Sequence, residues 1–103
     1  MPNFMKMMQQ AASMQKEMAR IQGELAQKTV EFSSGGGMVK ATARGDGSLA
    51  GLHIDPQVVN PAEVEMLEDL VTAAVDGALQ AAKELAAQEM GKVTAGLNIP
   101  GLG

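Results

Sequence analysis

The stretch that decides the fold runs from residue 31 to residue 55 and reads EFSSGGGMVKATARGDGSLAGLHID. Apolar and polar residues alternate along it, and the glycine-containing pieces GGG and GDG interrupt the alternation. A period of two indicates β-strands, and such pieces favour the tight turns of antiparallel hairpins. With a first strand that begins near Thr29, the sequence predicts a three-stranded antiparallel meander.

The same alternation predicts the register of both hairpins, because apolar residues should share one face of the sheet. A two-residue turn at Asp46 and Gly47 gives the cross-strand pairs Ala43–Ala50, Ala41–Leu52 and Val39–Ile54. A two-residue turn at Gly35 and Gly36 gives the pairs Phe32–Val39, Val30–Ala41 and Glu31–Lys40. One face of the meander is then apolar throughout.

The run Gly35–Gly37 with Lys40 close behind it also raises the alternative of a phosphate-binding loop. A P-loop needs a Ser or Thr directly after its lysine, and a helix whose N-terminus meets the phosphates. Here Ala41 follows the lysine, and an alternating strand follows the glycines. We therefore interpret the glycines as turn residues, which supply the positive φ angles of a hairpin.

Helical periodicity flanks the meander on both sides. Before it, apolar residues recur in steps of three and four, which indicates a long helix from about Asn3 to Gln27. After it, Asn60 and Pro61 predict a helix start, and a second seam leads to an end near Met90 and Gly91. The first seam comprises Phe4, Met7, Ala11, Met14, Met18, Ile21 and Leu25, and the second comprises Val64, Leu67, Val71, Ala74, Ala78, Ala81 and Leu85.

We therefore expect one α+β domain with the order α-β-β-β-α over residues 1–90. A flexible tail that contains glycine and proline is expected over residues 91–103. Two long helices with narrow seams expose too much apolar surface for a single protomer of this size, so a homodimer is predicted. The seams could pair within one chain or between two chains.

Composition and charge narrow the classes of function. The chain has no cysteine, which excludes disulfides and thiolate metal sites, and no apolar run of about 18 residues that could span a membrane. Its N-terminus also lacks the continuous apolar core of a signal peptide, so a cytoplasmic protein is expected. The formal net charge of −4 is uneven, since residues 1–28 carry four cations and two anions, whereas residues 61–103 carry two cations and seven anions.

The sequence gives little support for a catalytic or metal-binding site. His53 is the sole histidine, and no nucleophile is recognisable near it and Asp55, so a solvated strand histidine is the better interpretation. The carboxylates of the second helix are spread over its outer surface instead of being clustered as ligands. Met7, Met14 and Met18 fall in the first seam, which favours packing over a soft-metal site.

The first helix carries a basic side away from its seam. Lys16 and Arg20 are neighbours at i and i+4, and Lys6 lies earlier on the same helix. A like-charged pair at this spacing slightly destabilises a helix, so contact with a polyanion is one candidate reason for it. On charge alone a solvated face is favoured, because cations are few and the pI is near 4.8.

Four pieces of the chain resemble the YbaB/EbfC family of bacterial nucleoid-associated proteins. In order, they are MKMMQQAASMQKEMARIQGEL, SGGGMVKATARGDGSLAGLHIDP, EMLEDLVTAAVDGALQAAKE and MGKVTAGLNIPGLG. The most specific parts are GGGMVK, IDP and EMLEDLV, and the resemblance covers almost the whole chain. The chain departs from the family pattern in its short N-terminal extension and in its acidity.

The resemblance implies a tweezer-like homodimer in the nucleoid that grips duplex DNA with its helices. It implies altered DNA conformation or compaction, an effect on gene expression, and no enzymatic activity, cofactor or small-molecule substrate. On this basis we assign phosphate contacts to Lys6, Lys16, Arg20 and Lys28. The alternative is a non-enzymatic protein-interaction module that uses the acidic C-terminal helix and the apolar seams.

Overall fold

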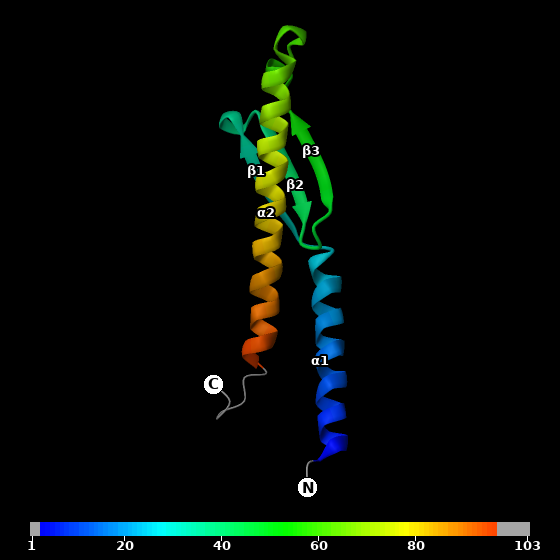
Figure 1. Ribbon diagram of the computed structural model, residues 1–103. Coiled ribbons are helices and arrows are strands. Elements are labelled where there is room, and N and C mark those ends of the chain that lie inside the picture. The colour runs from blue at the N-terminus through cyan, green and yellow to red at the C-terminus, as the bar shows by residue number, and fades with distance from the viewer. Residues whose placement is uncertain (1–2, 97–103) are drawn as a thin grey trace.

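The computed structural model describes residues 3–96, which form a small sheet and two long helices (Figure 1). The elements are α1 (Phe4–Leu25), β1 (Thr29–Ser34), β2 (Val39–Arg44), β3 (Leu49–Ile54) and α2 (Val64–Gly96). The strands are antiparallel in the order β1-β2-β3. The predicted α-β-β-β-α order and the meander are therefore confirmed. The molecule is elongated, with extents of 74, 24 and 16 Å.

The register of the first hairpin differs from the prediction by two residues. Its turn is longer than two residues, because Gly35, Gly36 and Gly37 all have positive φ angles and Ser34 is the residue that pairs with Val39. Ser34 is held there by its hydroxyl, which donates a hydrogen bond of 2.6 Å to the carbonyl oxygen of Leu70 in α2. A shift of two leaves every residue on its predicted face. The observed pairs are Phe32–Ala41, Val30–Ala43 and Glu31–Thr42.

Lys40 consequently lies opposite Ser33 and not opposite Glu31 as predicted. It still reaches Glu31 diagonally, with 3.9 Å between Lys40 Nζ and Glu31 Oε2. The lysine behind the glycine run is thus a cross-strand ion-pair partner on an exposed face of the sheet.

The second hairpin confirms two of its three predicted pairs. Val39 lies opposite Ile54 and Ala41 opposite Leu52, but a β-bulge places Leu49, not Ala50, opposite Ala43. The bulge follows from a longer turn, in which the backbone N–H of Arg44 donates a hydrogen bond of 2.7 Å to the carbonyl of Ser48. The Asp46 carboxylate fixes that turn by accepting hydrogen bonds from the backbone N–H and the hydroxyl of Ser48, at 2.9 and 2.6 Å.

The main core lies between the sheet and the N-terminal half of α2. Small side chains line both surfaces, so the helix approaches the strands closely. The closest approach is at Gly77, where a Cβ atom would lie 2.1 Å from Cδ1 of the Phe32 ring. The fully buried residues are Val39, Ala41 and Ala43 of β2 and Ala74, Ala78 and Ala82 of α2.

The second predicted seam is right at five of its seven positions, since Ala74 and Ala78 are buried and Leu67, Val71 and Leu85 pack against a core, and it fails at Ala81 and Val64. Ala82 is fully buried, whereas the predicted Ala81 is only partly buried, because the buried stripe advances in steps of four. Val64 at the start of the helix is 51% exposed. Asn60 acts as the predicted cap, but its Oδ1 accepts from the Ala62 N–H at 3.0 Å in a single 3₁₀ turn that precedes α2.

A second, smaller core joins the two helices near the end of α1. Ile21 and Leu25 of α1 are buried against Val93 of α2, with Leu85, Ala86 and Met90 packed around them. The helix end predicted near Met90 and Gly91 is therefore too early, because burial of Val93 accompanies a helix that continues to Gly96. The rest of the predicted tail, residues 97–103, lies outside the described residues.

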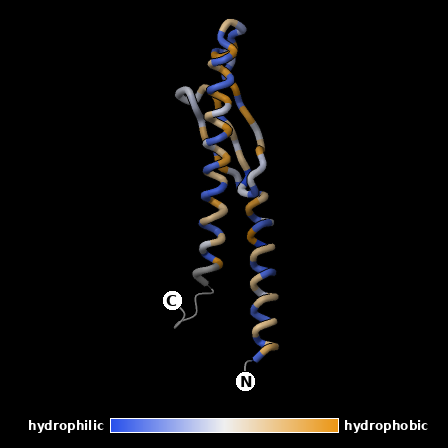
Figure 2. The backbone as a smooth tube through the Cα atoms, viewed as in Figure 1, coloured by the Kyte–Doolittle hydropathy of each residue, from blue (hydrophilic) through white to orange (hydrophobic). Residues whose placement is uncertain are grey.

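Most of the α1 seam finds no cover within the protomer. Phe4 is 69% exposed and Met7 is 61% exposed, and apolar bands remain visible along this helix in Figure 2. Within one chain, the two predicted seams thus meet only at the last turns of α1.

Candidate nucleic-acid interface

Three of the four predicted DNA contacts lie on α1, and the fourth follows it. Lys6, Lys16 and Arg20 are exposed residues of the helix, and Lys28 is an exposed residue of the link to β1. Asn3 caps the helix, because its Oδ1 accepts a hydrogen bond of 3.2 Å from the Lys6 N–H. The 22 residues of α1 make a rod of about 33 Å that projects away from the sheet (Figure 1).

Lys6 and Lys16 are the two cations on this arm that are free to meet an anion. Within the described part of the chain, neither ammonium group makes an ion pair or a hydrogen bond to another side chain. Lys16 also lines a shallow hollow of α1 together with Gln9, Ser13 and Gln15. Amide and hydroxyl groups of this kind assist lysine in contacts with phosphate.

Arg20 is held by two glutamates of its own helix. Its guanidinium donates hydrogen bonds to Glu17, one turn before it, and to Glu24, one turn after it, the latter at 2.6 Å. The hydrogen bond from Arg20 holds the pKa of Glu17 below its ordinary value, so the carboxylate stays ionised at neutral pH. The three side chains together carry a net negative charge, which cancels the contribution of Arg20 to a basic face.

Lys28 is engaged in a similar way, but with the other helix. Its Nζ lies 3.3 Å from Oε1 of Glu89 in α2, and Lys92 approaches the same oxygen at 3.4 Å. Hydrogen bonds from Lys28 and then Lys92 lower the pKa of Glu89. The pair joins the link after α1 to α2.

The structure therefore divides the four predicted residues into two classes. Lys6 and Lys16 are unpaired, whereas Arg20 and Lys28 are partly neutralised. The sequence contained the signal for Arg20, because Glu17 and Glu24 lie at i−3 and i+4 from it. It contained no comparable signal for Lys28, whose partner is 61 residues away.

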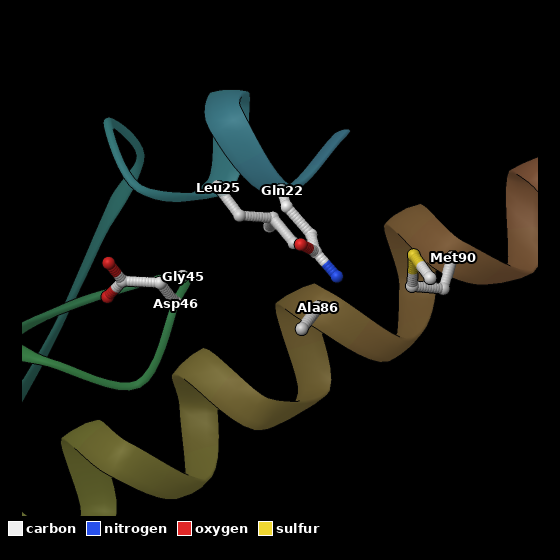
Figure 3. A pocket seen from close by; sticks show the side chains of 6 residues that line it. All are labelled: Gln22, Leu25, Gly45, Asp46, Ala86 and Met90. Atoms are coloured by element: carbon white, nitrogen blue, oxygen red, sulfur yellow. The ribbon is translucent and has the colours of Figure 1, made fainter. Parts of the chain in front are cut away.

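A cavity of about 330 Å³ lies where α1, the β2–β3 turn and α2 meet (Figure 3). Gln22 and Leu25 point from α1 toward Ala86 and Met90 of α2, and Gly45 and Asp46 close one end. The Asp46 carboxylate points away from the other side chains and is occupied by Ser48. The cavity thus offers a small apolar hollow with a single free amide, which is a poor match to catalysis.

The remaining candidates for chemistry stay apart. His53 is exposed on β3, and Asp55 accepts a hydrogen bond of 2.9 Å from the Gln57 N–H, so the carboxylate acts as a turn cap. Among residues 3–96, no three His, Asp or Glu side chains gather where they could hold a metal ion. None of the helices described is long and apolar enough to cross a membrane.

Comparisons with known proteins identify the family of the chain. The model of the YbaB/EbfC DNA-binding family matches residues 1–97. A nucleoid-associated protein of Caldanaerobacter subterraneus is 55% identical over 100 residues, which cover 97% of this chain and 90% of that protein. A nucleoid-associated protein of Syntrophobacter fumaroxidans is 54% identical over 95 residues, covering 92% and 86% of the two chains.

The fold is also found in a solved structure. The crystal structure of an uncharacterised Helicobacter pylori protein matches with a TM-score of 0.81 and covers 91% of this chain and 99% of that one. At 21% identity this likeness concerns the fold alone. The family match over nearly the whole chain, together with relatives above 50% identity, is decisive, and the chain belongs to the YbaB/EbfC DNA-binding family.

Proposed function

We propose that the chain binds duplex DNA as a homodimer, chiefly through Lys6 and Lys16, and alters the conformation or compaction of DNA in the nucleoid. The observation that carries the proposal is the projecting α1 arm, whose two lysines have no carboxylate partner in the described chain. Arg20 and Lys28 are secondary contacts, because phosphate must first displace their glutamates.

The exposed surface of the protomer supports the homodimer. A compact monomer of 10.7 kDa would expose about 5,500 Å², whereas this protomer exposes 7382 Å². The excess is roughly 1,900 Å². Part of this excess belongs to the projecting helices. Large apolar side chains contribute to it on α1 and on β3, and such surface favours association.

Two arms in one assembly explain why binding would change the shape of DNA. A dimer presents each lysine twice, so one duplex can be contacted at separated phosphates. Contacts to the backbone from Lys and Arg hold any sequence about equally, and their spacing decides whether the duplex must bend to reach them. An effect on gene expression would follow from this change in DNA shape.

Fluorescence anisotropy of a labelled duplex tests the proposal. Lys6→Ala/Lys16→Ala should weaken binding to unrelated duplex sequences by a similar factor. The matched control is Lys40→Ala/Lys83→Ala, which removes two exposed lysines that lie off α1 and should leave affinity nearly unchanged. Equal losses in both double variants would contradict a role for α1, and an unchanged length of tethered DNA would contradict compaction or bending.

A protein-interaction module is the second candidate, and the exposed apolar residues of α1 favour it. Phe4, Met5 and Met7 are each at least 61% exposed. This function would be preferred if duplex DNA gave no saturable binding and a protein partner were retained after nuclease treatment.

A further inference from the structure

We infer that four methionines of α1 form a reversible oxidation site, at which hydrogen peroxide converts thioethers to sulfoxides and loosens the free end of the arm. The four residues are Met5, Met7, Met8 and Met14. The site follows from the exposure of these side chains, and its effect on DNA binding rests on the proposed function. Three features carry the inference: the composition of the chain, the position of its exposed methionines, and the lack of support for the arm.

Methionine is the main target that this chain offers to a peroxide. The sequence has nine methionines and no cysteine, tryptophan or tyrosine. A cysteine thiolate would react first, because it is the stronger nucleophile, but this chain contains none. An oxidant that reaches the protein therefore acts on thioethers, and the exposure of each methionine decides the order in which they react.

The exposed methionines are concentrated on the arm. Within residues 3–96, five methionines are exposed, and four of these five lie on α1. Their exposed fractions range from 42% at Met14 to 70% at Met5, and the fifth exposed methionine is Met66 of α2. The other methionines in this range are partly buried, so the first oxidation events fall on α1. They are Met18, Met38 and Met90.

Oxidation of each thioether is a balanced two-electron step. The sulfur donates an electron pair to one oxygen of hydrogen peroxide, the O–O bond breaks and an S–O bond forms. The proton of the transferred oxygen moves to the departing hydroxide, which leaves as water. The reverse change needs a methionine sulfoxide reductase, which releases the oxygen as water while a dithiol is oxidised to a disulfide. The modification is therefore reversible.

The arm is sensitive to this change because few contacts outside the helix support it. Within α1, which the structure describes in full, the buried residues are Ile21 and Leu25 in the last turns. A helix without tertiary contacts is marginally stable in water, so pairs between its own side chains matter. Met7 and Met8 lie at i+3 and i+4 from Phe4, the spacing at which aromatic and methionine side chains stabilise a helix. A sulfoxide is polar, so oxidation removes this stabilisation.

Lys6 connects the oxidation site to DNA. It lies between Met5 and Met7 at the free end of α1, and its ammonium group has no carboxylate partner among the described residues. Fraying of this end releases Lys6 from its fixed position, so its contact with phosphate costs more conformational entropy. Lys16 lies closer to the buried Ile21 and keeps its place. Oxidation therefore weakens one of the two lysine contacts of each protomer.

The test compares two methionine-to-leucine variants before and after treatment with hydrogen peroxide. Leucine keeps the apolar character and the helix propensity of methionine but has no thioether. The protected variant is Met5→Leu/Met7→Leu/Met8→Leu/Met14→Leu. The matched control is Met66→Leu, which removes the exposed methionine outside α1. Peptide mass spectrometry gives the order of oxidation, circular dichroism gives the helix content, and fluorescence anisotropy of a labelled duplex gives the dependence of affinity on salt.

The wild type should respond in all three measurements. Peptides with the α1 methionines should gain oxygen before those with Met38 or Met90, and the helix content should fall. The slope of log Kobs against log salt concentration should shrink by about half, because two of the four lysine contacts of the dimer are weakened. Reductase treatment should restore the helix content and the slope. Met66→Leu should respond as the wild type does, and the protected variant should keep its helix content and slope.

Each part of the inference has a result that would overturn it. Oxidation of Met38 and Met90 as fast as that of Met5 would remove the site. An unchanged helix content in the oxidised wild type would contradict the loosening of the arm, and equal losses of slope in the wild type and the protected variant would contradict its effect on DNA. An untreated chain without saturable binding to duplex DNA would instead contradict the proposed function, and the order of oxidation and the helix content would still decide whether the site exists.

Discussion

Freeing Arg20 from its glutamates should strengthen DNA binding and steepen its dependence on salt. The double variant Glu17→Gln/Glu24→Gln removes both carboxylates that accept hydrogen bonds from Arg20. Glutamine keeps the length and the helix propensity of glutamate, so the arm itself should be preserved. Surface ion pairs of this kind contribute little to stability, and the variant should unfold much as the wild type does.

The expected size of the effect follows from the number of free cations. Each neutralised phosphate adds about −0.9 to the slope of log Kobs against log salt concentration. Lys6 and Lys16 of two protomers make four contacts and a slope of about −3.6, and two released arginines bring it to about −5.4. Between 50 and 200 mM salt, affinity would then fall roughly 150-fold for the wild type and roughly 1,800-fold for the variant.

Fluorescence anisotropy of a labelled duplex across this range of salt measures both slopes. The control is Glu63→Gln/Glu65→Gln, which makes the same change in net charge near the start of α2, away from the arm. Its slope should stay at the wild-type value. At about 0.9 per contact, a wild-type slope near −7 would mean that all eight candidate cations already contact phosphate. It would refute the distinction between the unpaired lysines, Lys6 and Lys16, and the partly neutralised Arg20 and Lys28. Identical slopes for both double variants would remove Arg20 from the interface.

Three further predictions concern stability. Gly77→Ala should destabilise the fold by about 1–3 kcal/mol, because the new Cβ would overlap the Phe32 ring. Gly91→Ala in the same helix meets no atom within 4 Å and should stabilise the fold by up to about 1 kcal/mol. Urea denaturation should therefore give changes of opposite sign in the free energy of unfolding. Val39→Ala should cost about 2 kcal/mol in the same assay, since Val39 is fully buried, and a cost near zero would contradict the packing of the main core. Glu89→Gln should reduce stability at neutral pH and have less effect as the pH falls below 4.5. Lys28 and Lys92 lower the folded-state pKa of Glu89 beneath that ordinary value, so the stabilisation is lost when the carboxylate is protonated. Denaturation curves of the two proteins that stay equally far apart at acid pH would refute this prediction.

Much of the fold could be predicted from the sequence because its signals are local. Alternation between Thr29 and Ile54 identified the strands, and glycine in GGG and GDG identified where they turn. The residues on the apolar face were predicted correctly even where the pairing register was wrong, because a shift of two residues keeps each side chain on the same face. The length of each turn was not predictable, since Ser34 and Asp46 extend the turns through hydrogen bonds that depend on their partners.

The candidate site was predictable only as a set of charges. Sequence placed Lys6, Lys16 and Arg20 away from the seam of one helix, but formal charge does not reveal which cations are already paired. The bond from Lys28 to Glu89 joins residues that are far apart along the chain, so only the packing of α1 against α2 creates it.

The sequence by itself determined the order of elements, the apolar face of the sheet and the family, because these depend on residue type and on spacing over a few positions. The tertiary structure decided which half of that apolar face is covered. α2 settles over β1 and β2, since Gly77 admits the Phe32 ring and the alanines of its buried stripe pack on β2. Leu49 and Leu52 remain open as a result, and no local pattern in the chain distinguishes these two leucines from buried ones.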